Sequence, residues 1–307
     1  MNNDVLLTGA SGFIGQHCIK ALINSGFRVN AVSSRVIRNH DRHSLTWHHA
    51  DLHNAEHVLR LLSAVKPAYL LHLAWDVTPG LYWQSISNLR WLKSSLVLLQ
   101  SFIESGGKRV VMAGSCAEYD WQYGYCREHL TPLKPHTLYG VCKSALQQVL
   151  VETANQAGIS AAWGRIFSVY GPGEDTGRLI PSLLINLLSG KEAVVQSGHR
   201  VRDYIYVKDA AGAFTALLKS DLQGPVNIAS GRPLSLAELA FRIADFAGRR
   251  DLLQLAAKEE INSEPDFLLA HTGRLVGELK YELQYTLDAG MQETGLYWQK
   301  KLEKDLE

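Results

Sequence analysis

The chain has 307 residues, of which 46% are hydrophobic, so it can bury the core of one large domain or of two small ones. Its 31 lysines and arginines nearly balance its 30 aspartates and glutamates, which argues against a nucleic-acid or membrane-surface partner and leaves a small molecule. A polar N-terminus and the lack of a bilayer-length apolar run predict a cytoplasmic protein. The four cysteines are far apart and form no CxxC pair, so we expect reduced thiols.

The first predicted strand, residues 5–7, leads through a glycine-rich turn into a helix with apolar residues at helical spacing. Gly9 allows a backbone conformation closed to other residues, Gly12 allows a phosphate to approach the main chain, and Gly15 allows close packing. The helix N-terminus favours an anion. We therefore predict a dinucleotide site rather than a plain structural turn. Its expected contacts are Gly9, Ser11, Gly12, Phe13 and Ile14.

The second predicted strand, residues 27–33, ends where a dinucleotide fold meets the adenosine ribose. A carboxylate there would bind the free hydroxyls of NAD, whereas an arginine would accept the 2′-phosphate of NADP. The sequence has Ser34, Arg35 and Arg38 and no acid, which favours NADP; NAD stays possible, because these arginines can also be solvated loop charges.

Six of the twelve histidines fall between His40 and His57, so a metal site has to be considered. His48 and His49 are adjacent on a predicted strand, 45–50, and point to opposite faces, and no cysteine or carboxylate cluster completes a ligand set. We expect a histidine-rich surface and no metal. Asp51 and Leu52 follow this strand, where the carboxylate can bond the adenine amino group or cap the next helix.

A fourth strand, 68–73, ends in Ala74 and Trp75. Leu73 and the small Ala74 can lie against the cofactor ribose, and Trp75 then faces the substrate, although Trp75, Tyr82 and Trp83 can equally be core residues. A long helix, 85–105, and a fifth strand, 109–113, follow. This alternation predicts an α/β fold of the Rossmann type, with a doubly wound parallel sheet covered on both faces.

The expected chemical centre follows the fifth strand. Tyr139 and Lys143 are four residues apart and share one helix face, so the lysine ammonium is expected to lower the pKa of the Tyr139 phenol towards neutrality. Tyr139 would then serve as a general acid or base. Ser115, at a strand end, can hydrogen-bond the same substrate oxygen, and Lys143 can also hold the nicotinamide ribose.

With these motifs the chain resembles the extended short-chain dehydrogenase/reductase family, in its NAD-dependent epimerase/dehydratase group acting on nucleotide sugars. The resemblance covers nearly the whole chain and includes TGASGFIG, DL at Asp51, HLAW at His72, Ser115, YGVCK at Tyr139, RIFSVYGPGE from Arg165 and RDYIYVKD from Arg202. It implies a nucleotide diphosphate sugar as substrate, with Arg202 on the diphosphate. A structural ion pair of Arg202 with Asp203 or Asp209 is the alternative. It also implies a homodimer formed by the helices at 85–105 and 138–157; the alternative is a monomer in which these helices are buried.

Departures from the family patterns narrow the reaction. The related 4,6-dehydratases have an Asp-Glu pair where this chain has Cys116 and Ala117, and the 3,5-epimerases have their cysteine at the position of Ala117. Chemistry that needs only serine, tyrosine and lysine remains. Ser34 and Arg35 favour NADPH and hence reduction of a keto group, most simply at C4, as in the similar NDP-4-keto-6-deoxyhexose reductases. An NAD-dependent 4-epimerase is the main alternative; a dehydratase or a non-catalytic NADP-binding regulator is less favoured. Trp75, Cys116 and Arg202 are the expected substrate contacts.

The second half breaks the alternation after a sixth strand, 161–168. A helix at 178–188 and a strand at 191–196 follow, and a helix at 207–219 with a strand at 225–228 is expected to return to the sheet. Ser235 and Glu238 form a capping-box pattern at the start of another helix, and 287–302 form the last one. We expect a cofactor domain at 1–167, with 207–228 returning to it, and a smaller, interleaved substrate domain at 168–307.

Overall fold

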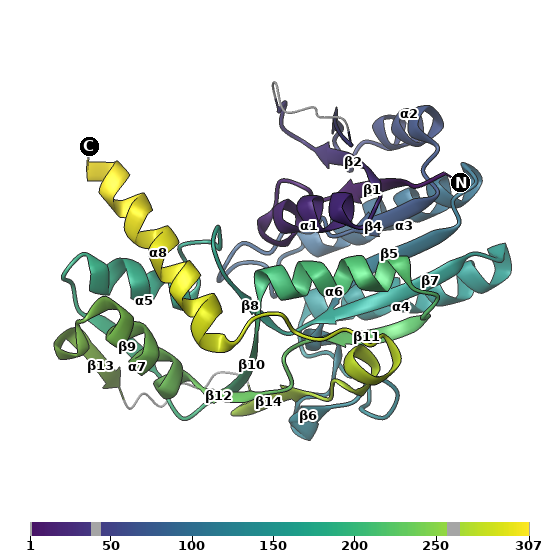
Figure 1. Ribbon diagram of the computed structural model, residues 1–307. Helices are drawn as coiled ribbons and strands as arrows, with labels where there is room; N and C mark the ends of the chain where they lie inside the picture. The colour runs from purple at the N-terminus through teal and green to yellow at the C-terminus, as the bar shows by residue number, and fades with distance from the viewer. Residues whose placement is uncertain (1, 38–43, 257–264, 307) are drawn as a thin grey trace.

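The computed structural model describes residues 2–37, 44–256 and 265–306. Its main feature is a seven-stranded sheet with the order β11-β7-β5-β4-β1-β2-β3, in which every neighbouring pair is parallel (Figure 1). This confirms the predicted Rossmann-type sheet. Its strands are β1 (Asp4–Thr8), β2 (Arg28–Ser33), β3 (Leu45–His49), β4 (Tyr69–His72), β5 (Arg109–Ser115), β7 (Ser160–Ile166) and β11 (Gly224–Ile228).

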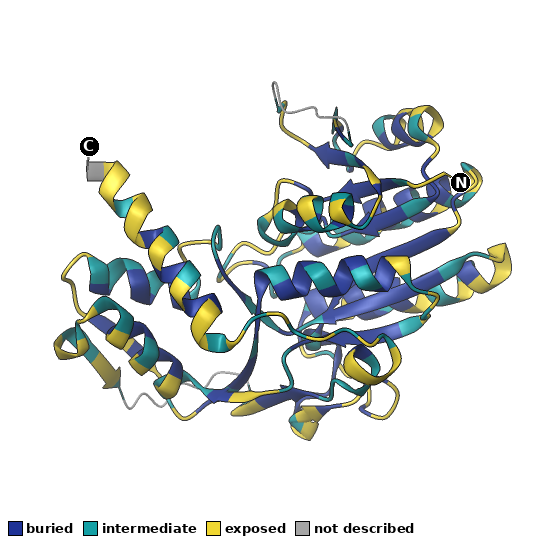
Figure 2. Ribbon diagram, in the orientation of Figure 1, coloured by how far each residue is buried: buried dark blue, intermediate teal, exposed yellow. Residues whose placement is uncertain are grey.

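Helices cover both faces of this sheet because alternate strand side chains are apolar on each face. Val5 and Leu7 of β1 pack into one buried cluster with α1 (Phe13–Asn24) and α6 (Val207–Lys219). Leu6, between them, packs into a second cluster on the opposite face. The helices of that second face are α2 (Ala55–Val65), α3 (Ser87–Glu104) and α4 (Leu138–Ala157). The strands are accordingly buried through the centre of the sheet (Figure 2).

A smaller unit packs beside the carboxyl ends of the strands (Figure 1). It contains a five-stranded sheet with the order β12-β10-β14-β6, in which β8 also pairs with β10, and a two-stranded sheet of β13 and β9. Three helices pack around a third apolar cluster. These elements are β6 (Tyr125–Cys126), β8 (Ser168–Tyr170), α5 (Leu179–Leu188), β9 (Ala193–Gln196), β10 (Val201–Tyr206), β12 (Pro233–Ser235), α7 (Leu236–Ala247), β13 (Leu253–Ala256), β14 (Phe267–Ala270) and α8 (Leu287–Leu306).

The chain passes between the large and the small sheet repeatedly, because β6, β8, β10, β12 and β14 of the small sheet are interspersed along the chain with strands of the large one. The prediction of a single strand at 161–168 is wrong in one respect. The segment divides at Phe167 into β7 of the large sheet and β8 of the small one. The chain switches sheets there, since β8 takes β10 as its partner instead of continuing beside β11. After β10, α6 and β11 return to the large sheet, as the sequence predicts.

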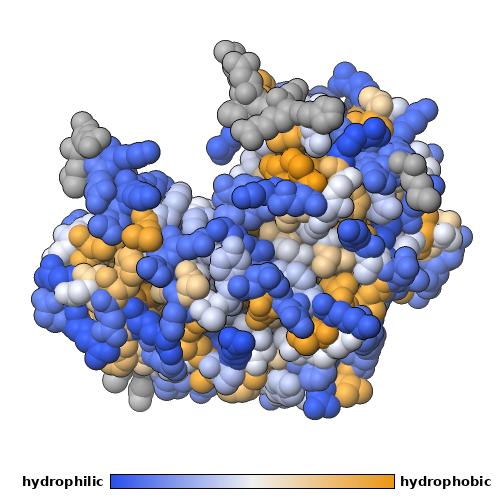
Figure 3. All heavy atoms as spheres, viewed as in Figure 1, coloured by the Kyte–Doolittle hydropathy of each residue, from blue (hydrophilic) through white to orange (hydrophobic). Residues whose placement is uncertain are grey.

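The surface agrees with the balanced composition. Hydrophilic side chains surround small apolar areas on the visible face (Figure 3). No helix in the described part of the chain is both long enough and apolar enough to cross a bilayer.

A buried arginine ties α6 to the sheet. Arg109 begins β5, is 5% exposed, and donates hydrogen bonds to the carbonyl oxygens of Leu217 at 2.7 Å, Leu218 at 3.0 Å and Leu222 at 2.7 Å. It also bonds Ser160 of the neighbouring strand. The last carbonyls of a helix lack partners within the helix and carry its negative dipole end, so this cation satisfies them.

We predict that Arg109→Met lowers the free energy of unfolding by about 2–4 kcal/mol, because two buried carbonyls and one partly buried carbonyl lose this donor. Urea denaturation of the purified protein measures this change. Arg28→Met is the matched control: it removes an arginine that pairs with Asp4 on the surface, so it should lower the free energy of unfolding much less than Arg109→Met. Equal losses in the two variants would contradict the role assigned to Arg109.

Candidate active site

The glycine turn after β1 has the shape that a dinucleotide requires. Gly9 has a φ of +70°, and a Cβ there would lie 2.7 Å from the backbone nitrogen of Ala74. A Cβ on Gly15 would overlap the Gly9 carbonyl. Gly12 is the N-cap of α1, and no side chain caps this helix end. The N–H groups of the first turn are therefore not capped by the Gly12 position and can bind a diphosphate.

The remaining residues predicted for the cofactor lie along the same edge. Ser34 and Arg35 directly follow β2 and are exposed, whereas Arg38 lies outside the described residues. The Asp51 carboxylate accepts a hydrogen bond from the His53 backbone N–H at 2.9 Å. The alternative of Asp51 as a helix cap is wrong, because Asn54 caps α2. Ser11, Phe13 and Ile14 lie at the start of α1, Leu52 follows Asp51, and Leu73 and Ala74 follow β4.

The described histidines between β2 and α2 make separate local contacts. His48 bonds the Asn30 side chain, His49 donates to the Ser34 carbonyl, and His53 bonds the Ser94 hydroxyl. His40 and His43 lie outside the described residues. In the described ranges, no group of three histidine, cysteine or carboxylate side chains is placed to hold a metal ion.

Ser115, Tyr139 and Lys143 come together at the carboxyl end of β5. Ser115 is the last residue of the strand, and the Thr137 side chain caps α4 just before Tyr139. Ser115 hydrogen-bonds the Tyr139 side chain. The Lys143 Nζ lies 5.8 Å from the centroid of the Tyr139 ring and donates to the Ala113 carbonyl at 2.8 Å.

Aromatic rings surround Tyr139. The rings of Trp75, Tyr82 and Trp83 meet its ring edge to face, with centroids 5.0–6.2 Å apart. The Lys143 Nζ lies 3.8 Å above the Trp75 ring, and the Trp75 indole N–H donates to Asn88. The sequence left open whether these residues belong to the core or face the substrate. In the structure Tyr82 and Trp83 stack on each other, and all three rings contact Tyr139.

The expected lowering of the Tyr139 pKa is wrong for this structure. Burial raises the pKa of Tyr139 above its usual range, and the hydrogen bond from Ser115 opposes this only in part. Burial also lowers the pKa of Lys143 to about 7, with the Glu118 charge opposing it. Burial disfavours both the Tyr139 phenolate and the Lys143 ammonium. The prediction of a lowered pKa considered only the attraction between these two charges.

Cys116 and Arg202 lie close to each other beside Ser115. Burial raises the pKa of the Cys116 thiol to about 12, although the Arg202 charge opposes this, so the thiol is neutral at physiological pH. The Arg202 guanidinium donates to the Val201 carbonyl at 3.0 Å. The two carboxylates proposed as its structural partners accept hydrogen bonds elsewhere: Asp203 from Ser230, Gly231 and Ala270, and Asp209 from Tyr281, Gln284 and Tyr285.

Sequence reasoning gave Glu118 no role. It is fully buried, pairs with Arg165 at 2.7 Å, and accepts hydrogen bonds from the Trp163 indole N–H and the Ser115 backbone N–H. The 3-10 turn Cys116–Glu118 (η1) forms a complete capping box with Ser115 as its N-cap. The Ser-x-x-Glu spacing of Ser115 and Glu118 is the same capping-box pattern that predicts a helix start at Ser235, and it could have predicted this turn.

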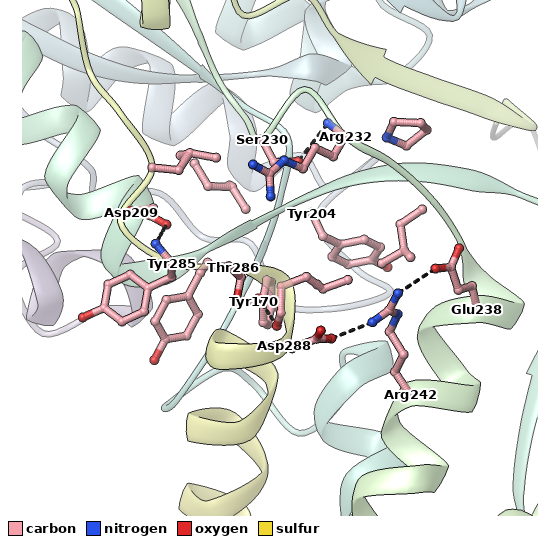
Figure 4. A pocket seen from close by; sticks show the side chains of 16 residues that line it. Tyr170, Tyr204, Asp209, Ser230, Arg232, Glu238, Arg242, Tyr285, Thr286 and Asp288 are labelled. Carbon is pink, nitrogen blue, oxygen red and sulfur yellow. Dashed lines mark hydrogen bonds and ion pairs between the residues drawn. The ribbon is translucent and has the colours of Figure 1, made fainter.

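A cavity of about 290 Å³ lies away from these residues, between β10, α7 and the start of α8 (Figure 4). Its charged lining is largely paired internally, with Arg242 bonded to both Glu238 and Asp288. The Tyr170 hydroxyl donates to the Leu287 carbonyl. Among the described residues, none that the sequence assigns to cofactor, catalysis or substrate lines this cavity.

The comparison with protein families decides the family. The model of the NAD dependent epimerase/dehydratase family matches residues 5–229, most of the chain. The protein belongs to this family. Membership fits the glycine turn and the Ser115, Tyr139 and Lys143 cluster, and it supports a pyridine nucleotide cofactor.

Individual relatives differ in their reactions. UDP-glucuronic acid decarboxylase 1 of Xenopus tropicalis is 25% identical and the alignment covers 97% of this chain and 73% of the relative. The dTDP-6-deoxy-L-talose 4-dehydrogenase (NAD(+)) of Aggregatibacter actinomycetemcomitans is 26% identical over 76% of this chain and 86% of the relative. UDP-glucose 4-epimerase of Thermotoga maritima, solved with UDP-glucose, superposes with a TM-score of 0.82 and 25% identity over 97% of this chain and 99% of that one. Such relatives support an enzyme that modifies nucleotide sugars.

We predict that the buried Lys143 makes stability depend on pH. Its pKa of about 7 in the folded chain lies below its ordinary value of 10.5, so the unfolded chain binds more protons between these two pH values. The free energy of unfolding should therefore rise with pH from 7 to about 9.5, by about 1.4 kcal/mol per pH unit at most. Denaturant titrations across this range, without cofactor, measure the slope.

Lys143→Met should remove this rise, and Lys20→Met, on the exposed face of α1, should keep it. A rise that survives in Lys143→Met would assign the pH dependence to another group.

Proposed function

We propose that the protein uses NADPH to reduce a keto group, at C4, of a nucleotide-activated deoxysugar. The observation that carries this proposal is the cluster of Ser115, Tyr139 and Lys143 at the carboxyl end of β5, next to the glycine turn of α1. A reduced nicotinamide supplies a hydride when it is bound. The chain has to supply the proton and hold the keto oxygen.

Tyr139 is the proposed proton donor to that oxygen. Its raised pKa keeps the phenol protonated at physiological pH, which is the form that a donor needs. Ser115 is proposed to hydrogen-bond the same oxygen and fix its position. Lys143 is proposed to bind the ribose hydroxyls and to stabilise the charge that Tyr139 acquires on losing its proton.

The neighbouring positions support a reaction without a further acid or base. Ala117 carries no titratable group, and the partly buried Cys116 is a neutral thiol. The Glu118 carboxylate is bound by the Arg165 guanidinium and the Trp163 indole N–H inside the protein. A dehydratase or a 3,5-epimerase would need a base at the positions of Cys116 and Ala117. The name of the talose 4-dehydrogenase, a relative, also refers to chemistry at C4 of a 6-deoxy sugar.

The proposed substrate contacts are Arg202 for the diphosphate and Trp75 and Cys116 for the sugar. The Arg202 charge lowers the pKa of the Cys116 thiol, and that thiol hydrogen-bonds Ser115, which supports a role for this cation beside the proposed catalytic residues. We also propose a homodimer formed by α3 and α4. These helices expose the apolar side chains of Leu89, Val141 and Val149 to solvent.

An NAD-dependent 4-epimerase is the second candidate. The observation that favours it is the similarity to the Thermotoga maritima UDP-glucose 4-epimerase along nearly the whole chain. Hydride removal and return at C4 would use the same three side chains. The two candidates differ in whether the nicotinamide is consumed, because an epimerase regains its cofactor in every cycle.

We predict that Tyr139→Phe abolishes turnover, with a loss of at least about 10²-fold, because the phenol is the proton donor. The readout is loss of NADPH absorbance with a panel of dTDP-, CDP-, GDP- and UDP-4-keto-6-deoxy sugars. Cofactor binding, measured by fluorescence, should be retained. Tyr123→Phe, at an exposed tyrosine, is the matched control and should keep full activity.

Stoichiometric loss of NADPH with one sugar would support the reductase. If the wild type consumes no NADPH but interconverts NDP-hexoses with bound NAD, the epimerase is the function. Full activity in Tyr139→Phe would contradict either mechanism.

Arg35 is the proposed contact for the 2′-phosphate of NADPH, since it is exposed at the end of β2. We predict that Arg35→Ala raises the KM for NADPH about 10- to 100-fold and leaves that for NADH nearly unchanged, because a charge-assisted hydrogen bond is lost. Arg28→Ala, at the other end of the same strand, should change neither value. Equal effects on the two cofactors would contradict an NADP site.

A further inference from the structure

We propose that Glu118 is a positioning residue of the candidate site, which holds the backbone of Ser115 and presents a fixed negative charge to Tyr139 and Lys143. The proposal rests on the proposed function, because it concerns the same catalytic side chains. It assigns a role to a carboxylate that the reaction itself does not use.

The contacts of Glu118 leave its carboxylate one orientation. It is 0% exposed, and one oxygen, Oε2, accepts from the Arg165 guanidinium at 2.7 Å. The other, Oε1, accepts from the Ser115 backbone N–H at 2.7 Å, and the Trp163 indole N–H lies within 3.0 Å of both oxygens. A buried carboxylate held by three donors cannot rotate without leaving one of them unsatisfied.

The network extends from Glu118 into β11. The Arg165 guanidinium also donates to the Tyr119 hydroxyl, and that hydroxyl donates to the Asn227 side chain at 2.7 Å. Asn227 lies on β11, and its backbone N–H donates a hydrogen bond to the Glu128 carboxylate. The position of Glu118 is thus tied to three strands of the large sheet.

Ser115 and the first turn of α4 depend on this arrangement. The Ser115 hydroxyl accepts from the Ala117 backbone N–H, while the Glu118 carboxylate accepts from the Ser115 N–H, so the two side chains fix the turn reciprocally. A Cβ on Gly114 would overlap Glu118 and the Trp163 ring, and one on Gly140 would overlap the Ala117 carbonyl. The turn and the start of α4, which carries Tyr139, are therefore packed directly together.

The charge of Glu118 acts on both titrating partners in one direction. It disfavours a phenolate on Tyr139 and favours an ammonium on Lys143, so it raises the pKa of both groups. Both effects keep protons on the pair, which suits donation to a keto oxygen. Ser115, Tyr82 and Cys116 also influence the pKa of Tyr139. Cys142 also influences the pKa of Lys143, and Lys143 in turn lowers the pKa of His72.

The test compares pH profiles of Glu118→Gln and wild type, using kcat for the keto sugar that the wild type reduces. Glutamine keeps an acceptor for the Ser115 N–H but removes the charge. The alkaline limb of the profile, where Tyr139 and Lys143 lose their protons, should move to lower pH by about one unit. A residue with only a structural role would change kcat or stability and leave this limb in place.

Two further variants keep the test decisive. Glu118→Gln leaves Arg165 buried and unpaired and can fail to fold, so the double variant Glu118→Gln/Arg165→Gln removes both charges together. It should show a shift in the same direction but a smaller one, because it also removes the Arg165 charge that partly offsets the charge of Glu118. Glu128→Gln is the matched control: Glu128 is also a buried carboxylate of this network, but it does not bond Ser115, and its variant should keep the wild-type limb.

A second readout needs no substrate. In the full chain without added cofactor, the double variant should begin its rise in unfolding free energy at lower pH than wild type, because Lys143 loses its stabilising neighbour. Wild-type profiles in both readouts would overturn the proposal for Glu118. If no keto sugar is reduced by the wild type, the proposed function fails, and the stability readout alone then supports or overturns the role of Glu118.

Discussion

Parallel hydrogen bonding between β1, β4 and β5 is the constraint on which the candidate site depends. Thr8 pairs with His72 and His72 with Met112, so the three strands end at one edge of the sheet. A buried hydrogen-bond chain from Thr8 through His72 to Ser95 of α3 holds this edge together. Burial lowers the pKa of His72 to about 3, so the imidazole is neutral and can bridge the two hydroxyls without adding charge. The glycine turn, Trp75 and Ser115 all lie at these strand ends.

Desolvation governs the electrostatics at this edge. Tyr139, Lys143 and His72 are buried and Cys116 is partly buried, and in each case removal from water is the largest influence on the pKa and favours the neutral form. The buried ion pair of Glu118 and Arg165 and the Arg202 guanidinium are charged groups that lie close to them. A site of this kind suits proton donation by a neutral phenol better than chemistry that begins from a thiolate or a free carboxylate.

Local patterns in the sequence predicted the elements that position the site. The glycine turn, the alternation of strands and helices, and the four-residue spacing of Tyr139 and Lys143 each depend on neighbours in the chain, and the structure has them. The route of the chain at Phe167 could not be predicted, because it depends on β10, which joins β8 only in the folded molecule. At Glu118 the local Ser-x-x-Glu spacing could have predicted the capping box, but the ion pair with Arg165 could not be predicted, because Arg165 lies on another strand. The direction of the Tyr139 pKa depends on burial by Trp75, Tyr82 and Trp83, and spacing alone does not report burial.

The most direct test of the proposed reaction is the fate of the hydride. NADPH that carries deuterium at the transferred position of the nicotinamide would be incubated with the protein and an NDP-4-keto-6-deoxy sugar, and the product examined by NMR spectroscopy and mass spectrometry. The account predicts one deuterium per product molecule, at C4 of the sugar. A product without deuterium, or with deuterium at another carbon, would contradict reduction at C4.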